Sequence, residues 1–397
     1  MYTQQDVLDF IQEEDVKFIR LAFFDLAGRQ KNVSIMPNQL PRAFQDGISF
    51  DASSVEGFQT PDKSDLFLHP DPSTMTIIPW RPTTGKVVRM FCDIRNPDGS
   101  PYRKDSRRIL KDTVEQARRA GYEFQIGTEM EFYLFNLDEG GNPTKIPFDY
   151  AGYRDIAPDD LGENIRRDIC FTLEQMGILP EASHHEEGPG QNEIDFHYAD
   201  PLTTADNTAT FKWIVRTKAV TNGLYADFSP KPLEGKPGNG MHINLSVKKS
   251  VQNKKGEDDK ALLSYALAGI LRHIEEITGY LNPVEDSYRR LGSAKAPAYI
   301  SWGRENRSQL VRIPATKDSA RLELRSPDAM ANPYLAYALV IAAALDGIQA
   351  QAVPPAAVEA DLFTASDTVT TALKKLPQSL EEARAKADCE FVRKVLG

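Results

Sequence analysis

EFQIGTEMEFYLF, residues 123–135, is the stretch on which the fold of this sequence depends. Its β-branched and aromatic residues predict a strand. Successive strand side chains point to opposite faces, so Glu129 and Glu131 share one face, roughly 7 Å apart, and Met130 and Phe132 share the other. Two carboxylates on one face repel each other unless a cation or bound protons offset their charge. The alternative is an exposed strand face with solvated glutamates.

A second acidic segment follows in SHHEEGPGQNEIDF (183–196). A Gly-Pro-Gly turn separates Glu186 from Glu193 and can fold both carboxylates back toward one point, although a plain polar loop also fits. Adjacent strand residues face opposite ways, so at most one of His184 and His185 joins these glutamates. We interpret both histidines as structural.

A third segment, GMHINLSV (240–247), alternates apolar residues with His242, Asn244 and Ser246. This alternation predicts a half-buried strand whose polar side carries one imidazole. A lone histidine in such a place is often only hydrogen-bonded. The glycine-rich turn PGNG before it lets backbone approach a ligand closely, but it matches neither the P-loop nor the dinucleotide fingerprint.

The fourth segment, SARLELRSPD (319–328), places Arg321, Glu323 and Arg325 on one predicted strand face. Arginine forks bind phosphate and carboxylate groups, and a carboxylate suits a metal ion. The alternative is a face of cross-strand salt bridges. Upstream segments add Arg290, Arg307 and Arg312. Glutamates with one imidazole suit magnesium or manganese rather than structural zinc, so the pattern predicts a metal-assisted nucleotide enzyme.

The composition limits the other possibilities. The chain has 397 residues and a formal net charge of −10, which argues against a nucleic-acid groove or a membrane surface. Its cysteines, Cys92, Cys170 and Cys389, are scattered and form no CxxC pair, which favours a reducing cytoplasm. No signal peptide is recognisable and no uncharged apolar run reaches ~18 residues, so neither a leader nor a membrane span is expected.

The order of predicted elements favours an α+β fold. The first ~105 residues read as strands and loops, and NPDGSPY (96–102) is a plausible boundary. Helices are then predicted over 105–121, 159–177, 206–223, 259–279 and 333–348. These helices mix with strands without a strict βαβ order, so the sequence predicts α+β with a small β domain in front.

Taken together, these segments resemble bacterial type I glutamine synthetase, most closely its shorter, Bacillus-like subclass. FDASSVEGF (50–58) is similar to the latch of the family's β-grasp domain, and GTEMEFYLF, SHHEEGPGQNEIDF, GMHINLS, NPVEDSYRRL, ENRSQLVRIP and RLELRSPDAMANPYL match its signatures in order. The resemblance implies an N-terminal β-grasp domain (1–104) and a glutamine synthetase catalytic domain (105–397), in which a curved antiparallel sheet is covered by helices.

The resemblance also implies a role for each site residue. Two or more Mg²⁺ or Mn²⁺ ions would be held by Glu131, Glu186 and Glu193 and by Glu129, His242 and Glu323. Glutamate would be bound by Gly238, Arg290, Arg307, Arg325 and Tyr153, and ATP by Asn244, Ser246, Arg312 and Arg321. The catalytic residues would be Arg290, Arg307 and Asp51, the last reaching in from a neighbouring subunit of a hexameric ring or stacked double hexamer.

The implied activity is ATP-dependent ligation of ammonia to the γ-carboxylate of glutamate through γ-glutamyl phosphate. Some positions depart from the family. RLGSAKAP (290–297) has Lys295 where the family's flap has a glutamate, and Pro237 replaces a substrate-binding asparagine. The chain also ends at VRKVLG, without the family's C-terminal helical tail, which makes ring stacking doubtful. A γ-glutamyl-amine ligase and a non-catalytic scaffold therefore stay open as alternatives.

Overall fold

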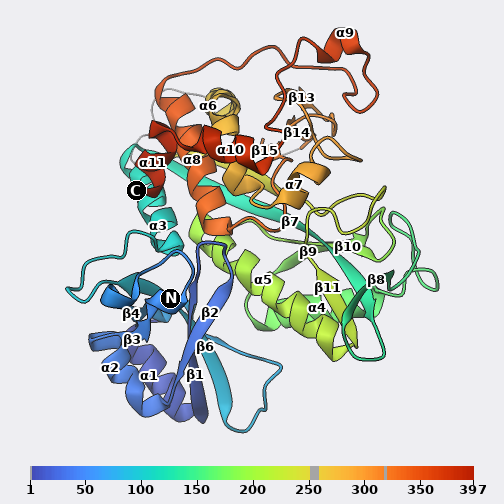
Figure 1. Cartoon of the computed structure of the whole chain (residues 1–397). Coiled ribbons are helices and arrows are strands. Elements are labelled where there is room, and N and C mark those ends of the chain that lie inside the picture. Colours follow the sequence, from blue (N-terminus) through green and yellow to red (C-terminus); the bar gives the residue numbers. More distant parts are fainter. Residues whose placement is uncertain (1, 251–258, 317–319) are drawn as a thin grey trace.

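The computed structural model describes residues 2–250, 259–316 and 320–397. Two sheets organise the chain, one built from its N-terminal part and one from the rest (Figure 1). Each sheet has its own cluster of buried apolar side chains. No helix within the described ranges is long and apolar enough to cross a membrane.

The N-terminal sheet has the strand order β2-β1-β6-β4-β3, and β5 pairs with β6. β1 runs parallel to β6 and antiparallel to β2, and helices α1 and α2 pack against β1 and β4. The bounds are α1 (Gln4–Glu13), β1 (Val16–Phe24), β2 (Gln30–Ile35), α2 (Leu40–Gln45), β3 (Ile48–Asp51), β4 (Asp65–Pro70), β5 (Thr76–Ile77) and β6 (Lys86–Arg95).

The second sheet has the order β13-β14-β15-β12-β7-β10-β9, and β8 and β11 also pair with β7. Its strands are β7 (Tyr122–Leu137), β8 (Pro143–Pro147), β9 (Pro180–His185), β10 (Gln191–Phe196), β11 (Leu224–Asp227), β12 (Met241–Lys249), β13 (Trp302–Arg304), β14 (Val311–Ile313) and β15 (Leu322–Leu324). The central strand β7 contains the stretch 123–135 that was predicted to be a strand. The predicted α+β class, a β-grasp domain followed by a curled catalytic sheet, is confirmed.

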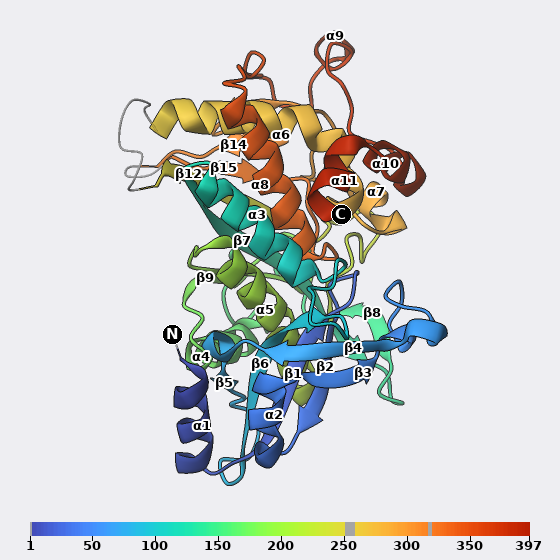
Figure 2. The same ribbon diagram turned by 90° about the vertical axis from the view of Figure 1, so that its left-hand side faces the viewer.

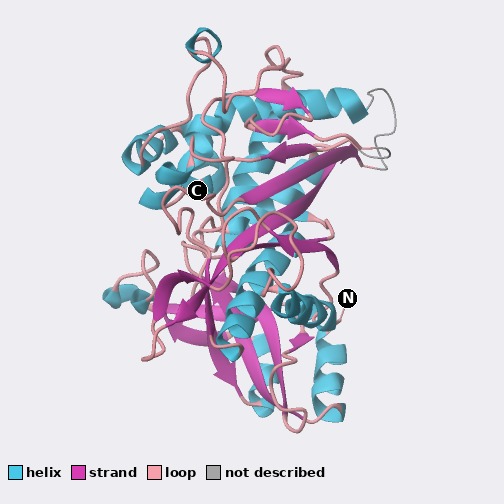
Figure 3. Ribbon diagram, turned by 90° about the vertical axis from the view of Figure 1, so that its right-hand side faces the viewer, coloured by secondary structure: helices cyan, strands magenta, loops and turns pink. Residues whose placement is uncertain are grey.

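Helices cover one face of this sheet, as Figure 2 shows for α3, α5 and α8. Figure 3 shows strands of the sheet from the opposite side. The helices are α3 (Ser106–Arg119), α4 (Glu163–Gln175), α5 (Pro201–Thr221), α6 (Asp259–Leu281), α7 (Glu285–Arg290), α8 (Pro333–Gln349), α9 (Asp367–Thr370), α10 (Leu380–Ala387) and α11 (Glu390–Leu396).

Local signals explain where these helices begin. α4 starts four residues later than the predicted 159–177, because the Asp160 carboxylate accepts hydrogen bonds from Gly162 N (2.9 Å) and Arg166 Nη1 (3.1 Å) and so stabilises a turn. α5 starts earlier than the predicted 206–223, because Asp200 caps its N-terminus and proline occupies its first position.

A buried arginine joins the two sheets. Arg107, at the start of α3, is 1% exposed and forms a two-pronged pair with Asp206, with Nε–Oδ1 3.0 Å and Nη2–Oδ2 2.9 Å. Its Nη1 also donates to Asp71 (3.0 Å) and Asp93 (3.2 Å) of the N-terminal part. The hydroxyl of Tyr334 donates to Asp206 at 2.6 Å. These contacts fix the N-terminal sheet against the catalytic sheet.

Candidate active site

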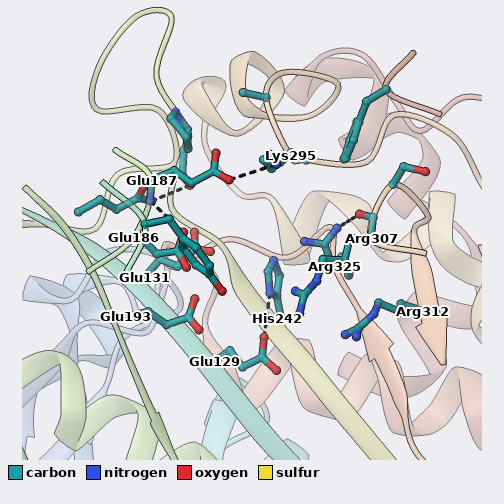
Figure 4. Close-up of a pocket in the computed structure, with 18 of the residues that line it drawn as sticks. Glu129, Glu131, Glu186, Glu187, Glu193, His242, Lys295, Arg307, Arg312 and Arg325 are labelled. Atoms are coloured by element: carbon teal, nitrogen blue, oxygen red, sulfur yellow. Dashed lines mark hydrogen bonds and ion pairs between the residues drawn. The ribbon is translucent and has the colours of Figure 1, made fainter. Parts of the chain in front are cut away.

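A cavity of about 630 Å³ lies over strands β7, β10 and β12. Figure 4 shows Glu131, Glu186 and Glu193 on one side of it and the arginines on the opposite side. The predicted site residues that line it are Glu129, Glu131, Tyr153, Glu186, Glu193, Gly238, His242, Arg290, Arg307, Arg312, Arg321 and Arg325. Segments almost 200 residues apart in the sequence therefore meet in one place.

One group of possible metal ligands is Glu129, His242 and Glu323, whose ligand atoms all lie within 4.8 Å of one another. The β7–β12 register sets His242 opposite Glu129, with Nδ1 3.1 Å from Oε2. Burial acts to raise the pKa of Glu129, but hydrogen bonds from His242 and Asn244 outweigh it and lower the pKa to about 2. Glu129 is therefore ionised, as a metal ligand must be.

The resemblance assigns Glu131, Glu186 and Glu193 to the other ion, whereas the second compact set of possible ligand atoms in the structure is His184, Glu193 and Asp195, all within 4.8 Å of one another. His184, which was interpreted as structural, therefore lies among the carboxylates of the cavity. The β7–β10 register places Glu193 directly opposite Glu131. Burial and the charge of Glu131 raise the pKa of Glu186 to about 7, and the same causes raise the pKa of Glu193 well above its usual range. The ring nitrogens of His184 lie 3.7 Å from Glu186 and 3.4 Å from Glu193. This side of the cavity is rich in carboxylates.

Glu323 lies between the ligand group of His242 and the arginines of the cavity. It is 1% exposed, and its carboxylate accepts hydrogen bonds from Arg312 and from Arg325 Nε, the latter at 3.0 Å. The strand predicted over 319–328 is shorter, since β15 covers only Leu322–Leu324, and Ser319 lies outside the described residues. Arg325 nevertheless reaches Glu323 from just beyond the strand end, and the predicted grouping of cation, anion and cation is present.

Arg290 lies at the cavity floor and is 3% exposed. Its guanidinium donates to the carbonyls of Ser326 (2.7 Å) and Arg325 (3.3 Å). Gly238 packs so closely beside it that an added Cβ would lie 2.1 Å from the carbonyl oxygen of Pro230. Only glycine fits there, so its backbone stays open to the cavity.

A smaller cavity of about 220 Å³ adjoins the first and shares Glu129, Asp195 and Arg321 with it. Asn244 and Ser246 of β12 line this smaller cavity. Asn244 Oδ1 accepts a hydrogen bond from Arg321 Nε at 2.8 Å, and Asn244 Nδ2 donates to Glu129 at 2.9 Å. The asparagine therefore links the two cavities.

Asp51 and Tyr153 occupy more exposed positions. Tyr153 is 50% exposed and lines the large cavity, with its ring edge-on to His184 at 5.5 Å between centroids. Asp51 ends β3 in the N-terminal sheet, where its carboxylate accepts hydrogen bonds from Ser53 and Ser54. It does not line the cavity of its own chain among the described residues, as its expected origin in a neighbouring subunit requires.

Three acidic residues of the cavity were missed from the sequence: Asp195, Glu187 and Asp361. Asp195 stands opposite Glu129 in the β7–β10 register, and burial together with Glu193 raises its pKa to about 9. Its position two residues after Glu193 on one strand already places both on the same face. Glu187 lines the cavity from the turn after β9. Asp361 and Phe363 also line it, and no sequence pattern indicated them.

Lys295 stands where the family's flap has a glutamate. In the structure its Nζ lies 3.1 Å from Glu187 Oε1, so its charge is paired (Figure 4). Its backbone φ is 66°, in the left-handed region.

The donor set fits divalent metal ions. Several carboxylates with one imidazole suit magnesium or manganese, and burial beside other carboxylates raises the pKa values of Glu186 and Glu193, a repulsion that a bound cation would offset. Arginines on the facing wall suit phosphate and carboxylate groups. This combination defines the class of metal-dependent enzymes that transfer phosphoryl groups.

Comparison with known proteins identifies the family. The chain belongs to the glutamine synthetase family: the family models described as "Glutamine synthetase, beta-Grasp domain" and "Glutamine synthetase, catalytic domain" match residues 15–97 and 103–397. It is therefore an ATP-dependent ligase of a family that uses divalent metal ions.

Relatives match along the whole chain. A glutamine synthetase of Methanosarcina mazei is 45% identical over 405 residues, covering 100% of this chain and 91% of the relative. One of Staphylococcus aureus is 42% identical over 407 residues, with coverage of 100% and 91%. The predicted resemblance to the Bacillus-like group is confirmed.

Solved structures show the same fold. A complex described as GmaS with ADP has a TM-score of 0.88 at 29% identity, covering 99% of this chain and 92% of that one. Glutamine synthetase of Plasmodium falciparum has a TM-score of 0.85 at 22% identity, covering 100% and 95%.

Proposed function

We propose that the chain ligates ammonia to the γ-carboxylate of L-glutamate, using ATP and Mg²⁺ or Mn²⁺ and passing through γ-glutamyl phosphate. The observation that carries the proposal is the close group Glu129, His242 and Glu323 beside a cavity that is lined by Glu131, Glu186 and Glu193 on one side and by arginines on the other. Three relatives named glutamine synthetase at 42–45% identity support it.

Each metal ligand has a proposed place. Glu131, Glu186 and Glu193 would hold one ion. Glu129, His242 and Glu323 would hold the other. Bound there, the ions supply positive charge that offsets the phosphate oxygens and orients glutamate and ATP. The low pKa of Glu129 and the raised pKa values of Glu186 and Glu193 support this division, since the group that contains Glu186 and Glu193 gains most from a cation.

The arginines would bind the anionic substrates. Arg290 and Arg325 would hold the carboxylates of glutamate, beside the backbone of Gly238. Arg307, together with Arg312 and Arg321, would offset charge on the transferred phosphoryl group. Figure 4 shows Arg307, Arg312 and Arg325 opposite Glu131, Glu186 and Glu193, while Arg312 and Arg325 are paired with Glu323 of the other ligand group.

The nucleotide and the ammonium acceptor would bind at opposite ends of the two joined cavities. Asn244 and Ser246 line the smaller cavity, which we assign to ATP. Tyr153, with Asp51 of a neighbouring subunit, would bind ammonium at the other end of the large cavity. This assignment requires a homo-oligomer, a hexameric ring or a stacked double hexamer, because Asp51 lies outside the cavity of its own chain.

The reaction then has two halves. A γ-carboxylate oxygen of glutamate attacks the terminal phosphorus of ATP, an O–P bond forms, and ADP leaves. The nitrogen of ammonia, after ammonium has lost a proton, attacks the γ-carbon. The C–N bond forms, the C–O bond to phosphate breaks, and the nitrogen loses a further proton to solvent. Arg307 and Arg312 offset the negative charge that develops on the phosphoryl oxygens.

Cytoplasmic location belongs to the same proposal. Cys92, Cys170 and Cys389 are free thiols, which fits a reducing compartment.

The test is phosphate release by the purified chain with ATP, Mg²⁺ or Mn²⁺, glutamate and one of several acceptors. We expect release to require metal and glutamate and to be fastest with ammonium, with glutamine as the product. Faster release with an alkylamine would favour the γ-glutamyl-amine ligase. No release with any acceptor would leave the non-catalytic scaffold and refute the proposed ligase.

A further inference from the structure

A salt bridge crosses the mouth of the large cavity. Lys295 Nζ lies 3.1 Å from Glu187 Oε1, and both residues line the cavity. Figure 4 shows the pair on the far side of the carboxylates from Glu129. In the described part of the chain, the pairs of His184 with Glu193 and of His242 with Glu129 join neighbouring strands of one sheet, whereas this pair joins the turn after β9 to the loop after α7.

The turn that carries Glu187 is rigid. Gly188, the next residue, packs against the ring of Tyr133, since an added Cβ would lie 1.9 Å from the tyrosine hydroxyl. Gly188 N donates to Gln191 Oε1 at 3.0 Å, and Glu187 N donates to Glu186 Oε2 at 3.1 Å. The Glu187 side chain is therefore presented from a fixed backbone next to a proposed metal ligand.

The segment that carries Lys295 is also fixed at its base. Ala296 N donates to Ser293 O at 2.9 Å, and Gly292 N donates to Pro297 O at 3.2 Å, which closes a compact loop directly after α7. Lys231 Nζ holds the loop from below through Ser293 Oγ at 3.0 Å. Lys295 stands at the tip of this loop.

The bridge adds little to the stability of the fold. The side chains of Lys295 and Glu187 are 62% and 39% exposed, and exposed ion pairs contribute little to folding. Lys295 also adopts a φ of 66°, which is unfavourable for a non-glycine residue. A strained, exposed pair placed over a cavity is better explained by what the cavity admits than by folding.

The bridge stands away from the proposed nucleotide end. The smaller cavity joins the large one at Glu129, Asp195 and Arg321, and neither Lys295 nor Glu187 lines it. On the proposed function, an acceptor reaches the bound glutamate from the mouth, past the bridge. While the salt bridge is formed, ammonia enters more easily than an alkylamine, because the alkyl group needs the space that the Lys295 and Glu187 side chains occupy.

We propose that the Lys295–Glu187 bridge selects the acceptor by size, keeping the mouth narrow so that ammonia is preferred over alkylamines. The proposal rests on the proposed ligase function. The paired charges also cancel, so that neither a free carboxylate attracts cationic amines nor a free ammonium group repels them. Both residues are specificity-determining here and take no part in the chemical steps.

The test compares kcat/KM for methylamine and for ammonium in the full chain with glutamate, ATP and Mn²⁺. We expect Lys295→Ala and Glu187→Ala each to raise the methylamine-to-ammonium ratio about fivefold, the scale of opening an exposed ion pair. The exchange Lys295→Glu with Glu187→Lys should return the ratio to the wild-type value. Lys236→Ala, which removes an exposed lysine that does not line the cavity, is the control.

The outcomes separate the two proposals. If the wild-type chain releases phosphate and the single variants keep its ratio, or if the exchanged pair behaves like the single variants, the selection by the bridge is overturned alone. If the wild-type chain releases no phosphate with any acceptor, the ligase function fails, and acceptor selection fails with it. A change in both kcat values with an unchanged ratio would indicate a structural role and also overturns the proposal.

Discussion

Replacing Glu193 by glutamine should make the metal-free protein more stable, although Glu193 is a proposed metal ligand. Glu193 lies directly opposite Glu131 across two strands, and its residue surface is only 8% exposed. Glutamine keeps the shape of the side chain and removes its charge. The matched change Glu323→Gln should have the opposite sign, because Glu323 is held by Arg312 and Arg325.

The magnitudes follow from these contacts. Directly opposed side chains stand about 5 Å apart, and two like charges at that distance repel by roughly 3 kcal/mol at an effective dielectric constant of 20. Because the raised pKa of Glu193 means that a proton relieves part of this repulsion, we expect a gain of about 2 kcal/mol at pH 8. Removing one partner of a buried ion pair costs about 3–5 kcal/mol, so Glu323→Gln should lose about 3 kcal/mol.

The assay is denaturant unfolding in EDTA and again with Mn²⁺. In the wild-type chain, metal at 100 times its Kd adds about 2.7 kcal/mol, and both variants should lose most of this gain. Glu174→Gln, an exposed change on α4, is the control and should shift neither curve by more than about 0.5 kcal/mol. A clear loss of metal-free stability in Glu193→Gln, or its full stabilisation by Mn²⁺, would refute the reasoning.

Two further predictions concern the joint between the sheets and the pH. Arg107→Ala leaves Asp206 buried without its partner and should reduce the free energy of unfolding by about 3–5 kcal/mol, measured by denaturant unfolding; a loss below about 1 kcal/mol contradicts the role of Arg107. In EDTA, the free energy of unfolding should fall as pH rises from about 4.5 to about 9. The pKa values of Glu186 and Asp195 are raised to about 7 and about 9 in the folded state, so the folded chain keeps protons that the unfolded chain has lost. Mn²⁺ should flatten this fall; a rise in metal-free stability over that range contradicts it.

Periodicity predicted the elements that carry the site. β7 and β12 alternate strictly enough to place Glu129, Glu131 and His242 on one face, and α8 is apolar enough to be buried. Element ends were predicted less well, because side chains decide them. Asp160 holds a turn where a helix was expected, and the strand around Glu323 is only three residues long.

Register was beyond the sequence, and the electrostatics of the site depend on it. The alternation of β10 shows that Glu193 and Asp195 share a face, but not that they stand opposite Glu131 and Glu129. For the same reason the partner of Lys295 could not be predicted. Nothing in RLGSAKAP indicates that Lys295 Nζ lies 3.1 Å from Glu187 Oε1 in the turn after β9. Pairing across strands and loops is set by tertiary packing, and local propensity carries no information about it.

Glu323 links the two walls of the cavity. Its Oε2 accepts from Arg312, and its Oε1 accepts from Arg325 and lies 3.7 Å from His242 Nδ1. Each oxygen therefore already accepts a hydrogen bond from a guanidinium, and a cation bound beside Glu129 would compete with that arginine for the carboxylate. An arginine released in this way faces the cavity with an unpaired positive charge, which favours an anion. Binding of cation and of anion is thereby coupled through one buried carboxylate, and Glu323→Gln should weaken cation binding and make anion binding independent of the metal.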